Sequence, residues 1–101
     1  MVRIYFDDDS DAVYGYKLSE VYDFMWENKI CDLEFNLIQY LQKKKIIDKS
    51  GKVISNKYGM ENIDVKTDKG LFEEEHQKYI FVPIEGARDL VGEIYNTMKG
   101  D

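Results

Sequence analysis

Apolar residues recur along the chain at spacings that switch between those of strands and those of helices. A short β-prone run at residues 2–6 leads into an acidic stretch that reaches residue 15, which predicts a first strand and then a loop. Residues 17–29 and 33–45 carry apolar side chains at helical spacing. Asp32 stands where the second of these helices would be capped. The first 45 residues therefore predict one strand and two helices.

The second half of the chain is richer in strand patterns. Residues 46–54 read as a hairpin around turn-forming residues, residues 63–66 alternate like a half-buried strand, and residues 79–82 form a continuous apolar run typical of a central strand. After Gly86, one helical face is formed by Leu90, Val91, Ile94, Tyr95 and Met98. We expect a single α+β domain over residues 1–101, in the order β-α-α-β-β-β-β-α. The two central helices and the C-terminal helix would pack on a small, mostly antiparallel sheet.

The composition of the chain indicates in which cellular compartment the protein is expected. The chain is 44% hydrophobic, but no apolar run approaches the length that crosses a membrane. The apolar start is short and is followed at once by acidic residues, which is not the pattern of a signal peptide. Cys31 is the only cysteine, so no internal disulfide can form. We expect a cytoplasmic protein with no membrane association.

Charge divides the chain into three segments. Residues 1–36 carry a net charge of −6, residues 37–57 carry +5, and residues 58–101 carry −5, so a basic segment separates two acidic ones. Only Arg3 and Arg88 are arginine among fourteen basic residues. Because arginine is the preferred residue for bidentate contacts to phosphate and guanine, its scarcity argues against sequence-specific reading of nucleic acid.

Two carboxylate patterns in the chain have part of the spacing of a metal site. Asp7, Asp9 and Asp11 alternate as in the first half of an EF-hand loop, but Ala12 and Leu18 occupy the positions that need Gly and Glu. Residues 73–76 join three glutamates to the only histidine, yet contiguous side chains point in different directions and seldom converge on one ion. We therefore expect no metal site.

Catalytic patterns are equally weak. Asp64-Val65-Lys66 matches the D-x-K of metal-dependent nucleases, but this spacing is expected by chance in a chain of this composition. One histidine, one cysteine and no phosphate-binding glycine loop leave no standard nucleophile and base pair. We expect a non-enzymatic protein without a cofactor.

The basic segment supports one binding hypothesis. Residues 37–54 carry a lysine-ended helix followed by a hairpin, and this pattern resembles the helix-to-wing segment of winged-helix proteins. The resemblance covers about a fifth of the chain and implies a helix in the major groove with wing lysines on phosphates. Apolar residues crowd this helix and it lacks arginine, in contrast to the family. Under this alternative, nucleic acid would be bound by Lys43, Lys44, Lys45, Lys49, Lys52 and Lys57.

The acidic segments support the hypothesis that we favour. Spaced carboxylates with tyrosines can occupy a basic cleft on another protein, and tyrosine is enriched at interfaces. In general character the chain resembles small phage-borne inhibitors of host nucleases and defence systems, which implies a DNA mimic or other anti-defence modulator. A protein partner with a basic surface would contact Asp7, Asp8, Asp9, Asp11, Tyr14, Tyr16, Glu73, Glu74 and Glu75. The +5 segment would have to overcome the repulsion of a −6 chain to bind DNA, which is why nucleic acid comes second.

Overall fold

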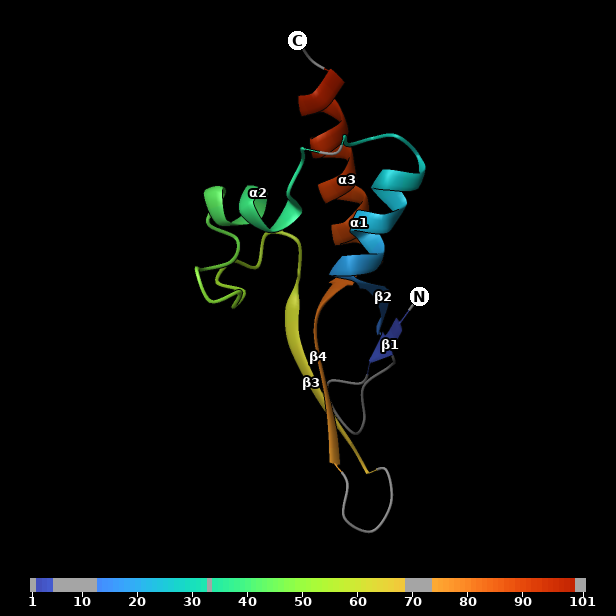
Figure 1. Ribbon diagram of the computed structural model, residues 1–101, viewed down its shortest axis with the longest axis vertical. Coiled ribbons are helices and arrows are strands. Elements are labelled where there is room, and N and C mark those ends of the chain that lie inside the picture. The colour runs from blue at the N-terminus through green and yellow to red at the C-terminus, as the bar shows by residue number, and fades with distance from the viewer. Residues whose placement is uncertain (1, 5–12, 33, 69–73, 100–101) are drawn as a thin grey trace.

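The computed structural model describes residues 2–4, 13–32, 34–68 and 74–99. Figure 1 shows the helices gathered beyond one end of a sheet, with a long two-stranded ribbon extending away from them. In chain order the elements are β1 (Val2–Ile4), β2 (Val13–Lys17), α1 (Leu18–Glu27), α2 (Leu37–Lys43), β3 (Glu61–Asp68), β4 (Glu74–Pro83) and α3 (Ile84–Lys99).

The sheet has four strands in the order β1-β2-β4-β3, and every neighbouring pair is antiparallel. β4 is an inner strand, as its apolar run predicted, and it pairs Val82 with Tyr16 on one side and Tyr79 with Ile63 on the other. Both α1 and α3 contact β2 and β4, so two helices pack on the sheet. The α+β class and the antiparallel sheet that we predicted are confirmed.

The segment before α1 was predicted as loop and is instead β2. Gly15 pairs with Pro83 inside the sheet and lies directly over the ring of Phe81. A Cβ at this position would fall 2.7 Å from the Phe81 ring and would overlap the carbonyl oxygen of Val82. Gly15 therefore allows two strands to approach closely, which is a different use of glycine from the loop that the sequence suggested.

The second helix is shorter than predicted, and its N-cap is a different residue. α2 begins after Asn36, whose side chain accepts a hydrogen bond from the Gln39 amide at 3.1 Å. The Asp32 side chain instead accepts from the Glu34 amide at 3.0 Å, which closes a turn of its own. Asparagine and aspartate are both good caps, and Asn36 is the one that directly precedes a continuous apolar face.

The predicted hairpin at residues 46–54 is present in short form: Ile47 forms an antiparallel bridge with Val53, the Asp48 amide donates to the Lys52 carbonyl at 2.9 Å, and the Ile54 amide donates to the Ile46 carbonyl at 2.8 Å. The Asp48 carboxylate holds the loop together by accepting hydrogen bonds from the Ser50 amide at 2.9 Å, the Ser50 hydroxyl at 2.6 Å and the Lys52 amide at 2.9 Å. These bonds, that of the Ser50 hydroxyl first, lower the pKa of Asp48. Hydrogen bonds to the Asp48 side chain therefore close the turn of this short antiparallel pairing.

α3 begins at Ile84, so Gly86 lies inside the helix rather than before it. Its apolar stripe divides into two parts. Leu90 and Ile94 are completely buried, whereas Tyr95 and Met98 are exposed. The main core gathers side chains from all three described helices, β4 and the connecting segments, including Met25, Leu41, Ile47, Tyr58, Val82, Leu90 and Ile94.

Tyr58 is buried against α3, where its hydroxyl donates a hydrogen bond to the Glu93 carboxylate. Lys57 pairs with the other oxygen of the same carboxylate at 3.5 Å. Burial, together with this hydrogen bond to Glu93, raises the pKa of Tyr58. The loop before β3 is thus fixed to the middle of α3.

Because of Tyr58, the free energy of unfolding should fall as the pH rises in the alkaline range. In the unfolded chain the Tyr58 hydroxyl ionises at pH ~10. In the folded protein the same hydroxyl keeps its proton to higher pH. The free energy of unfolding contributed by Tyr58 is therefore complete below pH ~10 and falls as the pH rises above it. We expect urea denaturation of the wild type between pH 9 and 11 to show a steeper loss of stability than that of Tyr58→Phe. Parallel pH profiles for the two proteins would contradict this assignment.

Candidate functional site

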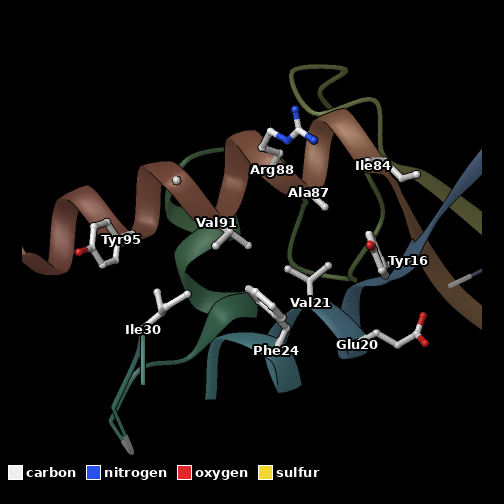
Figure 2. A pocket seen from close by; sticks show the side chains of 11 residues that line it. Tyr16, Glu20, Val21, Phe24, Ile30, Ile84, Ala87, Arg88, Val91 and Tyr95 are labelled. Carbon is white, nitrogen blue, oxygen red and sulfur yellow. The ribbon is translucent and has the colours of Figure 1, made fainter. Parts of the chain in front are cut away.

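A groove of about 580 Å³ lies between α1 and α3. Both helices run beside one another from the end of the sheet (Figure 1). Figure 2 shows that the lining comes mainly from these two helices, with Tyr16 contributed by β2 and Ile30 by the segment after α1. The apolar lining residues are Tyr16, Val21, Phe24, Ile30, Ile84, Ala87, Val91 and Tyr95.

The groove is open because its large side chains are only partly covered. Phe24 projects from α1 into the space between the helices, below Val91 of α3 (Figure 2). Half of the Phe24 surface remains accessible, and 45% of Tyr95. Gly92 presents no side chain to this wall, and a Cβ there would meet nothing within 4 Å. An apolar surface of this kind on a small protein is typical of a binding site.

Two charged residues border the groove, Glu20 on α1 and Arg88 on α3. The Glu20 carboxylate accepts a hydrogen bond from the Lys17 amide at 2.7 Å, and this bond lowers the pKa of Glu20. Glu20 therefore belongs to the N-terminal cap of α1 and stays ionised near neutral pH. α1 carries three acidic residues and no basic residue, but only Glu20 of these lines the groove, where Arg88 of α3 supplies the opposite charge.

The chain was compared with known families, curated proteins and solved structures. No family model, curated protein or solved structure matches the chain. The groove and the charged surfaces around it are therefore the basis for any functional assignment.

The acidic residues that we predicted as a partner surface fall in different places. Asp7, Asp8, Asp9, Asp11 and Glu73 lie outside the described residues. Glu74 and Glu75 begin β4, where they pair with Asp68 and Thr67. Because Tyr16 pairs with Val82 near the other end of this strand, roughly 25 Å of strand separates these glutamates from the tyrosines.

The two predicted tyrosines are closer to the groove. Tyr16 lines it directly, and Tyr14 is an exposed residue of the same strand. Tyr14 also borders a neighbouring cleft of about 570 Å³, together with Glu85 and Asp89 near the start of α3. The aromatic part of the predicted surface thus lies beside the helices, and there it meets acidic residues that the sequence did not single out.

Of the six lysines in the alternative prediction, three lie together. Lys43, Lys45 and Lys49 line a second groove, of about 730 Å³, between α2 and the loop that follows it. Lys52 is exposed on the same loop, and Lys44 lies over the Tyr40 ring, 5.5 Å from its centroid. Lys57 is instead held near α3 by Glu93. Residues 46–54 form only a short hairpin, paired through the one bridge between Ile47 and Val53.

Sequence reasoning missed Phe24 and the groove role of Val91 and Tyr95. The signal was present as an excess of apolar residues, since α1 carries more of them than one helical face can bury. Met25 takes the core face and is completely buried, while Phe24 takes the groove face. The helix therefore has two apolar faces, where its sequence spacing predicts one.

Two further predictions concern metal binding and membrane association. Within residues 2–4, 13–32, 34–68 and 74–99, no three His, Cys, Asp or Glu side chains gather closely enough to hold a metal ion. Asp64 of the D-x-K pattern lies exposed on β3. None of the helices described is long and apolar enough to cross a membrane.

Proposed function

We propose that this protein acts by binding another protein, without catalysis, and that the groove between α1 and α3 receives an apolar segment of its partner. The observation that supports this function is the partly exposed pair Phe24 and Tyr95, one on each helix that forms the groove. Burying such aromatic surface against a partner is a main source of binding free energy, because apolar area leaves water.

The shape and charge of the groove favour an amphipathic helix as the segment that binds. Two helices lying side by side leave a groove that a third helix can occupy with its apolar face. α1 carries Glu20, Asp23 and Glu27 and no basic residue, although only Glu20 of these lines the groove, so basic residues on the α1 side of the bound segment would be complementary. This agrees with our expectation of a partner that has a basic surface.

The overall charge supports a narrower form of the proposal. A net charge of −6 suits an inhibitor or modulator that occupies the basic cleft of a nucleic-acid-handling enzyme, as a DNA mimic or phage anti-defence protein would. The single cysteine, Cys31, is buried, and its presence as a free thiol suits the reducing cytoplasm.

The groove is tested with a defined probe, a fluorescent 18-residue helical peptide with leucines on one face and lysines on the other. We expect micromolar binding by fluorescence anisotropy, and Phe24→Ser should weaken it about tenfold, since roughly half a phenylalanine side chain loses its contact. Ile38→Ser is the matched control, because Ile38 is an exposed apolar residue on α2 outside the groove. Equal affinities of the wild type and Phe24→Ser would exclude the groove as the binding site.

A further inference from the structure

The second groove, between α2 and the loop at residues 46–54, has its own chemistry. Five lysines and one carboxylate occur in residues 37–54, and three of those lysines line this groove. Among the described residues, Lys43, Lys45 and Lys49 form no ion pair. Their ammonium groups are exposed and available to an anionic ligand.

The floor of this groove is partly apolar. Ile54 lines it with 56% of its surface exposed, and the buried Ile47 lines it as well. Glu34 and Asp48 also line the groove, so three lysines outnumber two carboxylates there, and the Asp48 carboxylate is directed to its own loop, from which it accepts three hydrogen bonds. Lysines around an exposed isoleucine form a surface that is both cationic and apolar.

We propose that this groove binds an acidic, amphipathic segment of a second protein, whose carboxylates face the lysines and whose apolar side chain covers Ile54. Charge complementarity supports an anionic ligand, and the exposed isoleucine favours a protein segment, because an apolar side chain of that segment can cover it while neighbouring carboxylates face the lysines.

The aromatic residues here support the same choice. Single-stranded nucleic acids bind by stacking bases on exposed aromatic rings. Tyr40 packs against Phe35, with ring centroids 5.7 Å apart, and Lys44 lies over the Tyr40 ring. The Tyr40 ring is therefore already in contact with protein groups. No arginine is present in this segment to contact phosphate bidentately.

The end of α2 supplies an unusual way to test this surface. Lys45 has φ +61°, with its amide bonded to the Gln42 carbonyl at 3.0 Å and the Ile46 amide bonded to the Leu41 carbonyl at 2.9 Å. This is a Schellman motif with lysine in the left-handed position where glycine is usual. α1 ends in the same way, with Lys29 at φ +57°.

The two lysines are a matched pair, because each replacement by glycine removes one charge and relieves one left-handed side chain. Of these two lysines, Lys45 lines the groove between α2 and the loop at residues 46–54, and Lys29 does not. We expect Lys45→Gly and Lys29→Gly each to raise Tm by about 2–5 °C. Lys45→Gly should nevertheless weaken binding of an acidic ligand about threefold, while Lys29→Gly leaves binding unchanged.

The probe is a fluorescent 12-residue peptide of glutamate with leucine at every fourth position, measured by anisotropy on the full chain at 50 and 150 mM NaCl. We expect binding that Lys43→Gln/Lys49→Gln weakens about tenfold and that Ile54→Ser also weakens. Phe24→Ser, in the other groove, should leave it intact, so the two surfaces can fail separately. The proposal is overturned if the peptide does not bind at 50 mM NaCl, if the lysine variants bind it like the wild type, or if a 20-nucleotide poly-dT binds more tightly than the peptide.

Discussion

Replacing Gly86 by alanine is expected to destabilise the protein by about 3 kcal/mol, even though alanine is the better helix former. Gly86 lies in the first turn of α3 and is buried against the backbone of Tyr58. A Cβ would overlap the Tyr58 carbonyl oxygen and would fall 2.8 Å from its carbonyl carbon. Because backbone atoms cannot turn aside as a side chain can, the helix and the loop at Tyr58 would have to separate.

The control lies six residues later in the same helix. Gly92 is exposed, and a Cβ there would meet nothing within 4 Å, so Gly92→Ala should stabilise the protein by about 0.5–1 kcal/mol. Urea denaturation followed by circular dichroism measures both variants. The two substitutions should change the free energy of unfolding in opposite directions, and changes of the same sign would refute the close contact between α3 and Tyr58.

Ile94→Ala is expected to cost about 2–5 kcal/mol of unfolding free energy. Ile94 is completely buried in the main core, so truncation removes apolar contacts and leaves a cavity. A domain of this size has a total stability of about 5–15 kcal/mol, so this one change could remove a large part of it. The melting temperature should fall accordingly, by calorimetry or circular dichroism.

Tyr95→Ala separates stability from binding at the adjacent residue. Because nearly half of Tyr95 is exposed, we expect it to cost less than about 1 kcal/mol of stability. It lines the groove between α1 and α3, so the leucine and lysine peptide should bind this variant about tenfold more weakly. A large loss of stability in Tyr95→Ala, or a small loss in Ile94→Ala, would mean that the two faces of α3 have been assigned in reverse.

The elements that could be predicted are those whose apolar period is long and uninterrupted. β4, α1 and α3 belong to this group, and so does β3, which extends the predicted run at residues 63–66 in both directions. β2 escaped because Gly15 interrupts its pattern, and glycine marks a loop far more often than a close contact between strands. The start of α2 was misplaced because Asp32 and Asn36 are both acceptable caps, and only tertiary packing of Leu37 selects between them.

The candidate sites were harder to predict than the fold. Lys43, Lys45 and Lys49 could be found because neighbours in the sequence remain neighbours on one turn and loop. The groove between α1 and α3 joins residues that are some sixty to seventy positions apart, so no local pattern could bring Phe24 and Tyr95 together. Sequence distinguishes apolar from polar positions, but it does not say which apolar face remains without a neighbour.

Both walls of that groove continue directly from adjacent strands. α1 begins at Leu18, the residue after β2 ends, and α3 begins at Ile84, the residue after β4 ends. β2 and β4 are hydrogen-bonded to each other at this point, through the pairs Lys17 with Phe81 and Gly15 with Pro83. The spacing of the helices is therefore set by the strand ladder before any ligand arrives. Such preorganisation means that a partner segment would lose mainly its own conformational freedom on binding.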